Sequence, residues 1–136
     1  MASDYWHLVR FFRLVGAGDD DTLPFGAPPL VIGPLVTMRE PVWRSARATL
    51  VAHGTPDVFD SWVWDKPLQP SAAARLLHNL DQLIADVEST GVVLYSDDLA
   101  EDDRPHPRRV IAAIQALRNL LVEAVSRSSD VETWVN

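Results

Sequence analysis

The stretch from Arg108 to Val125 reads RRVIAAIQALRNLLVEAV and decides how the rest of the chain must fold. Its apolar residues recur at helical spacing and form one face, made of Val110, Ile114, Leu117, Leu121 and Val125. The face is widened on both sides by Ile111, Ala113, Leu120 and Ala124. A helix that is apolar around most of its circumference is normally covered by several other elements. The stretch therefore predicts a buried central helix, and it does not indicate a function.

A second helix is predicted between Pro70 and Gly91, because proline favours the first turn of a helix and glycine the position after its end. It carries a narrower apolar stripe made of Leu76, Leu77, Leu80, Leu83, Ile84 and Val87. Pro105 and Pro107 fit the first turn of the central helix, where their missing N–H groups cost nothing. The two helices are expected to pack together as a C-terminal helical hairpin.

Residues 4–15 are ambiguous between strand and helix. Their aromatic and β-branched residues favour a strand. Three polar residues, His7, Arg10 and Arg13, recur at every third position, however, and strict alternation fails. The spacing predicts a short N-terminal helix that ends at Gly16.

The remaining elements are predicted strands. They cover residues 35–38, 42–52 and 58–64, and the last two are joined by a turn at 53–57. The apolar run at 91–95 is a candidate for one further strand. The fold class is therefore α+β, with a small antiparallel sheet packed against the C-terminal helical hairpin and a short N-terminal helix. Residues 1–136 form a single domain in this interpretation.

Two segments fit neither helix nor strand. Residues 16–34 form an irregular arm rich in proline and glycine, yet too apolar for a solvated linker. Residues 129–136 form a short C-terminal tail that ends near a tryptophan. The arm could pack over its own domain or reach a neighbouring subunit.

The chain of 136 residues carries a net charge of −7 and has no cysteine. Disulfides, thiolate nucleophiles and cysteine zinc sites are therefore excluded. The segment 71–106 alone holds eight acids against two bases, whereas 107–136 holds four bases against three acids. An acidic chain without a basic stripe is a poor ligand for nucleic acid. The N-terminus lacks the pattern of a signal peptide and no apolar run is long enough to span a membrane, so we expect a cytoplasmic protein that does not bind membranes.

The large aromatic residues are the best candidates for partner contacts. Trp62 and Trp64 share one face of a predicted strand whose other face is also apolar, so one face needs a cover. The arm of the same chain is the preferred cover, and a partner protein is the alternative, since tryptophan is enriched at binding hot spots. The predicted partner-binding residues are Phe25, Leu30, Trp43, Trp62, Trp64 and Trp134.

Catalytic and metal chemistry has weaker support. His53 and Asp57 flank a predicted turn and could act as a general base with its orienting carboxylate, but such pairs are common in loops. The acidic residues of 96–104 could gather round a hard cation, yet a solvated loop is the preferred interpretation. We expect no cofactor and no metal.

Three functional classes follow. The preferred one is a non-enzymatic protein–protein interaction or assembly subunit of structural or adaptor type, such as a component of a phage particle, that self-associates or joins a multi-subunit assembly. The second is an acidic inhibitor or immunity-type protein that covers a basic partner. The third is a small hydrolase that uses His53 and Asp57.

The charge distribution gives a first testable prediction. At physiological salt the protein should bind neither duplex nor single-stranded DNA, because few phosphates could be neutralised by its dispersed arginines. Fluorescence anisotropy with labelled oligonucleotides will measure this. A salt-sensitive complex with a micromolar dissociation constant would contradict it.

Overall fold

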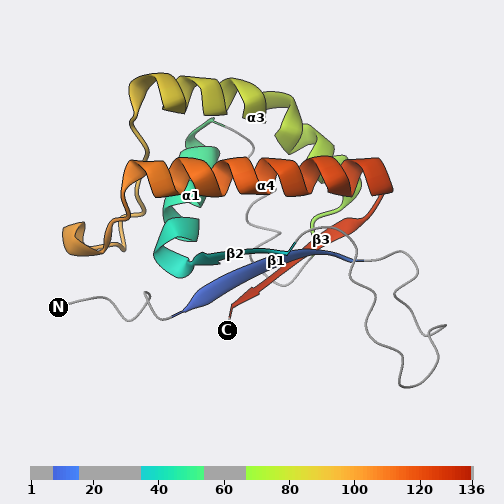
Figure 1. The fold of residues 1–136 in the computed structure, drawn as a ribbon, viewed down its shortest axis with the longest axis horizontal. Coiled ribbons are helices and arrows are strands. Elements are labelled where there is room, and N and C mark those ends of the chain that lie inside the picture. Colours follow the sequence, from blue (N-terminus) through green and yellow to red (C-terminus); the bar gives the residue numbers. More distant parts are fainter. Residues whose placement is uncertain (1–7, 16–34, 54–66, 136) are drawn as a thin grey trace.

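A three-stranded antiparallel sheet and helices stacked on one of its faces make up the fold (Figure 1). The computed structural model describes residues 8–15, 35–53 and 67–135. Their elements in chain order are β1 (Val9–Val15), β2 (Val36–Arg39), α1 (Glu40–His53), α3 (Pro70–Thr90), the short 3-10 helix η2 (Glu101–Asp103), α4 (Pro107–Arg127) and β3 (Asp130–Val135). The predicted α+β class, with a small antiparallel sheet against a C-terminal helical hairpin, is confirmed.

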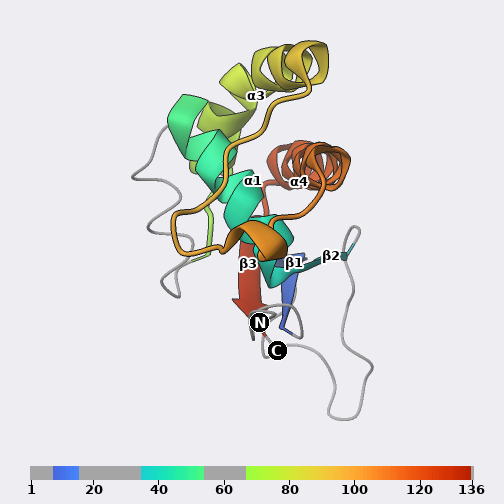
Figure 2. The same ribbon diagram turned by 90° about the vertical axis from the view of Figure 1, so that its left-hand side faces the viewer.

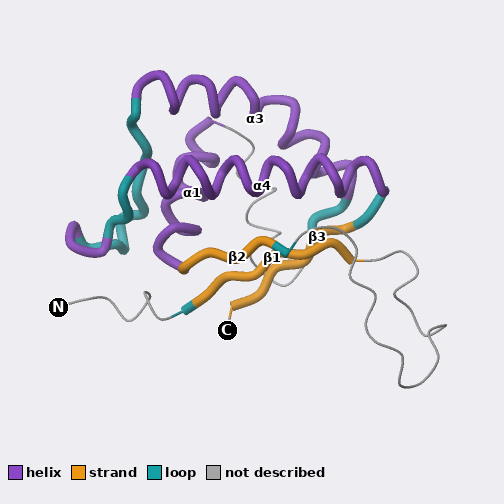
Figure 3. The backbone as a smooth tube through the Cα atoms, viewed as in Figure 1, coloured by secondary structure: helices purple, strands orange, loops and turns teal. Residues whose placement is uncertain are grey.

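Strand β1 is the centre of the sheet, whose order is β2-β1-β3 (Figure 3). It pairs with β2 from Val9↔Arg39 to Phe12↔Val36, and with β3 from Arg10↔Val135 to Val15↔Asp130. The sheet therefore joins the two ends of the described chain directly.

The pleat of β1 sends alternate side chains to opposite faces of the sheet. Arg10, Phe12 and Leu14 are buried under the helices, whereas Phe11 and Arg13 lie on the other face. In the neighbouring strands Met38 and Val131 pair with Arg10 and Leu14, and both are buried on the same inner face.

The helices form two layers above the inner face of the sheet (Figure 2). Helices α1 and α4 lie next to the strands, and α3 packs against α4 from the far side. The seven buried residues of α4 are Val110, Ala113, Ile114, Leu117, Leu120, Leu121 and Ala124. Val125, which was expected on the buried face, is 37% exposed. The predicted central helix is confirmed as the element between the sheet and α3.

Both long helices begin and end where their sequences indicate. Helix α3 begins at Pro70, and Gly91 caps its end with a φ of 69°, a conformation that costs glycine little. Helix α4 begins at Pro107, and the His106 side chain accepts a hydrogen bond from the Arg108 amide at 3.1 Å. The starts of both helices and the end of α3 therefore match their local sequence signals.

Three secondary-structure predictions need correction. Residues 9–15 are strand β1 and not part of a short N-terminal helix, while residues 1–7 lie outside the described part of the chain. The predicted strand at 42–52 is helix α1, and the run at 91–95 is irregular rather than a strand. The strand predicted at 35–38 is confirmed as β2, whereas 58–64 lies outside the described residues.

Helix α1 can bury its small polar residues because their hydroxyl groups are hydrogen-bonded. The Ser45 hydroxyl donates to the Pro41 carbonyl at 2.9 Å, and the Thr49 hydroxyl donates to the Ser45 carbonyl at 2.9 Å. Thr49 also accepts a hydrogen bond from the Leu94 amide at 3.0 Å, which ties the helix to the segment after α3. Buried hydroxyls therefore face the core without losing their hydrogen bonds.

The segment predicted as a C-terminal tail is mostly strand β3. Its residue Val131 is fully buried, and the amide of Val131 donates to the Leu68 carbonyl at 2.8 Å. The return bond, from the Leu68 amide to the Val131 carbonyl, measures 2.7 Å. The end of the chain is thus an integral part of the sheet.

This role of β3 predicts a contrast between Val131 and Val135, which lie near the two ends of the strand. Val131→Ala should lower the free energy of unfolding by about 1–2.5 kcal/mol, because it opens a cavity in the core. Val135→Ala, on the same strand but at a residue that is 39% exposed, should cost less than about 0.5 kcal/mol. Urea unfolding followed by circular dichroism will measure both. Equal effects would show that β3 is not anchored at Val131.

Candidate partner-binding surface

The outer face of the sheet, opposite the helices, is the candidate partner-binding surface. Among the described residues no helix or loop covers it, and α1, α3 and α4 all lie on the inner side (Figures 1 and 2). The alternating pleat places Phe11, Arg13, Thr37, Glu132 and Trp134 on this face.

The centre of the outer face is an aromatic pair from opposite ends of the chain. Register places Phe11 opposite Trp134, and their rings stack with centroids 5.2 Å apart and planes inclined by 5°. Trp134 remains 37% exposed, so part of its side chain is open to solvent. Aromatic pairs across strands typically contribute about 0.5–1.5 kcal/mol beyond the burial of their area.

Charged groups complete this surface. The Arg13 guanidinium lies 5.3 Å from the centroid of the Trp134 ring and forms an ion pair with Glu132, which sits directly opposite it on β3. Exposed ion pairs of this kind are worth about 0–1 kcal/mol, so their main effect is to fix the side chains in place. The outer face thus presents a held aromatic group with one positive and one negative charge beside it.

Two of the contact residues predicted from the sequence are described, and they differ in exposure. Trp134 lies on the exposed outer face of the sheet. Trp43 is not available to a partner, because it is only 1% exposed and packs edge-on against Phe12 at 5.0 Å. Trp43 was mistaken for a surface residue because its segment was interpreted as a strand and not as an amphipathic helix.

The other predicted contact residues lie outside the described part of the chain. They are Phe25, Leu30, Trp62 and Trp64. The same holds for Asp57 of the hydrolase hypothesis, while His53 is the last residue of α1. Phe11 was missed as a site residue, since only the register of β1 against β3 brings it to Trp134.

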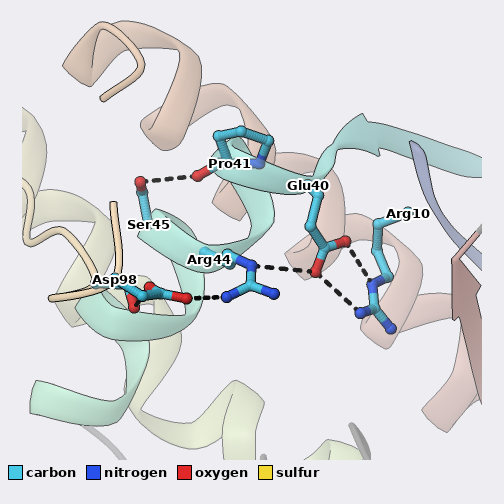
Figure 4. A network of polar contacts seen from close by, with 7 residues as sticks. Arg10, Glu40, Pro41, Arg44, Ser45 and Asp98 are labelled. Carbon is cyan, nitrogen blue, oxygen red and sulfur yellow. Dashed lines mark hydrogen bonds and ion pairs between the residues drawn. The ribbon is translucent and has the colours of Figure 1, made fainter. Parts of the chain in front are cut away.

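A second polar feature lies on the inner side and joins the sheet to the helices (Figure 4). The Arg10 guanidinium donates to both carboxylate oxygens of Glu40, at 3.2 and 3.0 Å. Both side chains are almost fully buried, with exposures of 10% and 4%. Buried arginine and glutamate are rare unless they are paired, and the bidentate geometry satisfies this requirement.

The pair is extended toward the loop that precedes α4. The Arg44 Nε lies 3.7 Å from a Glu40 oxygen, and its Nη1 binds the carboxylate of Asp98. This loop also buries Leu99 and Asp103, so it packs more tightly than a wholly solvated acidic loop would. The chain of charges links β1, α1 and the loop, and its geometry serves to hold these elements together.

On the far side of α4, Arg118 Nε donates a hydrogen bond to the Asp81 carboxylate at 2.8 Å, and this bond together with the negative charge of Asp81 raises the pKa of Arg118. The arginine remains charged at every physiological pH, so the pair connects α3 to α4 and does not supply an acid or a base. Within the described residues no three histidine, aspartate or glutamate side chains are grouped as a metal site would require. None of the described helices has the length and apolar character needed to cross a membrane.

Comparison of the chain with known protein families, with characterised proteins and with solved structures found no match.

The buried ion pair gives a prediction with an internal control. Glu40→Gln should lower the free energy of unfolding by about 3 kcal/mol, because it leaves the buried charge of Arg10 uncompensated. Glu132→Gln makes the same chemical change in an exposed pair and should cost less than about 1 kcal/mol. Chemical denaturation of both variants will measure the difference. A Glu40→Gln variant as stable as the wild type would show that the pair does not hold α1 on the sheet.

Proposed function

We propose that the protein is a non-catalytic assembly subunit that binds a second copy of itself through the outer face of its sheet. The observation that carries the proposal is the Phe11–Trp134 stack, a large aromatic surface held in place on a face that no described element covers. Hot spots at protein interfaces are typically such fixed aromatic groups.

The arrangement of charge favours a second copy over an unrelated partner. A two-fold interface brings one surface against itself, so each charged residue must meet the opposite charge on the other copy. Arg13 and Glu132 supply both signs beside the aromatic centre. A rotation about an axis through this centre can place Arg13 of each copy beside Glu132 of the other.

The area of the outer face limits the affinity expected for the dimer. Three strands spaced about 4.8 Å apart and about 20 Å long outline roughly 300 Å². Stable complexes usually bury about 800 Å² on each partner. The proposed dimer is therefore weak, with a dissociation constant in the micromolar range or above. The predicted contact residues Phe25 and Leu30, which lie outside the described part, belong to the same proposal and would enlarge the contact.

A second candidate function rests on the acidic surface. Acids on α3 and in the following loop are exposed, among them Asp86, Glu88, Asp97, Glu101 and Asp102. An inhibitor or immunity-type protein could use them to cover a basic partner, in which case it would remain a monomer by itself. Either role is compatible with the cytoplasmic location predicted from the sequence, which stays part of the proposal.

Charge reversal tests the two-fold arrangement. Arg13→Glu alone and Glu132→Arg alone should each weaken self-association at least about tenfold, because like charges then meet across the interface. An equimolar mixture of the two variants should associate again, since the glutamate introduced in one variant meets the arginine introduced in the other. Analytical ultracentrifugation from about 5 to about 500 µM will measure this.

The mixture is decisive because it cannot restore an Arg13–Glu132 ion pair within one molecule. Both variants keep like charges at positions 13 and 132 of the same molecule, so any recovery must come from contacts between molecules. Val122→Ala, at an exposed valine of α4, serves as the control and should associate like the wild type. A wild-type protein that is monomeric throughout this concentration range would reject the proposal and favour the inhibitor hypothesis.

A further inference from the structure

A groove with a volume of about 450 Å³ runs between strand β2 and helix α4. It is lined by all four residues of β2, by Val42, and by Arg109, Ala112, Ala113 and Ala116 of α4. The alanines of α4 leave room above the strand, because longer side chains at these positions would fill it. The groove lies at the edge of the sheet and borders the outer face, since Thr37 and Arg39 line the groove and belong to the outer face by register.

One wall of the groove is an open sheet edge. Strand β2 is the first strand in the order β2-β1-β3, and no described strand pairs with its other side. The Glu40 amide donates to the Leu8 carbonyl at 3.0 Å. By register, the backbone groups of Met38 and Val36 also point toward β1. Backbone groups alternate in direction along an antiparallel strand, so those of Thr37 and Arg39 point outward from the sheet. An open edge of this kind can hydrogen-bond an added strand.

The charge at the groove is opposite to that of the whole chain. Among the described residues, the charged ones that line it are Arg39 and Arg109, both exposed, and neither forms an ion pair with another described residue. The chain as a whole carries a net charge of −7, and five of its eleven arginines form ion pairs with acids in the described part of the chain. Two unpaired cations at one apolar groove therefore favour an anionic ligand.

We propose that this groove binds an extended acidic peptide of a partner protein, which adds to β2 as an additional strand. Backbone hydrogen bonds to Thr37 and Arg39 hold the peptide, as in other cases of strand addition. Its alternate small apolar side chains enter the space over Val42 and Ala113, and its carboxylates meet Arg39 and Arg109. The proposed ligand is a heterologous partner and not a second copy of the chain.

The test uses synthetic peptides of eight residues as probes. The first alternates valine with aspartate and the second alternates valine with lysine. In the third, proline replaces both central residues of the acidic sequence, one valine and one aspartate, and so removes a donor that strand pairing needs in either strand direction. An oligothymidylate of similar charge tests for simple polyanion binding. Fluorescence anisotropy of labelled probes on the full chain measures affinity, and amide chemical shifts locate the contact.

The first peptide should bind with a dissociation constant at least about tenfold lower than those of the other three probes, because only it combines charge and strand pairing. Shift changes should centre on 36–39 and 109–116. Arg109→Ser should weaken binding about fivefold, whereas Arg75→Ser, at an exposed arginine of α3, should leave it unchanged. Ala116→Phe should block the groove.

With the unmodified chain, each of these results would overturn the proposal: no binding of the first peptide up to millimolar concentration, equal binding of the proline peptide, or equal binding of the oligothymidylate. Binding that appears only after Asp19, Asp20 and Asp21 are changed to Asn would also overturn it, since the groove would then hold the chain's own acidic segment. Two variants distinguish peptide binding at the groove from self-association through the outer face. Arg109→Ser should leave the sedimentation behaviour unchanged, and Arg13→Glu should leave peptide binding unchanged.

Discussion

The pairing of β1 with β3 is the interaction on which the rest of the structure depends. It joins residues 10–15 to residues 130–135 in one antiparallel register, so the two ends of the described chain close the fold. Bringing together two strands that are more than 100 residues apart in the sequence costs conformational entropy. The compensation comes from the inner face of the sheet, where Phe12 and Val131 are fully buried beneath α1 and α4. Every feature of the outer face follows from the same register.

The Arg10–Glu40 pair shows how strictly this register is held. A shift of one residue along β1 would move the arginine to the outer face and bring Phe11 under the helices. Glu40, buried at the start of α1, would then lack its bidentate partner. Buried ion pairs contribute little net stability, but losing one partner is costly. We infer that the pair acts chiefly against alternative registers, while the apolar contacts supply most of the stability.

The sequence predicted the parts of the fold that local chemistry determines. Helices α3 and α4 carry apolar stripes, with proline at the start of each and Gly91 after α3, so both starts and the end of α3 were predicted. Strand β1 was mistaken for a helix because Arg10, taken as a surface residue, is in fact buried against Glu40. Helix α1 was mistaken for a strand because its residues alternate in size and include β-branched types. Its buried hydroxyl groups bond to carbonyls one turn earlier, and Thr49 also accepts a hydrogen bond from Leu94, a tertiary contact that no local pattern reveals.

The candidate surface was predictable only in part, for a related reason. Trp134 could be singled out as an aromatic residue without a local role, but its partner Phe11 lies near the opposite end of the chain, and only tertiary register brings them together. The groove beside β2 could not be foreseen at all, because it depends on where α4 crosses the sheet edge.

Pairing of β1 with β3 also lowers the entropic cost of binding a partner at the outer face. Ordering a flexible side chain at an interface costs about 0.5–1.5 kcal/mol. Phe11 and Arg13 already hold Trp134 in the folded subunit, so most of that cost falls on folding and not on association. A ligand that binds only the folded form stabilises it by mass action. Because Trp134 and the buried Val131 belong to the same short strand, a partner on the outer face would therefore strengthen the pairing that closes the fold.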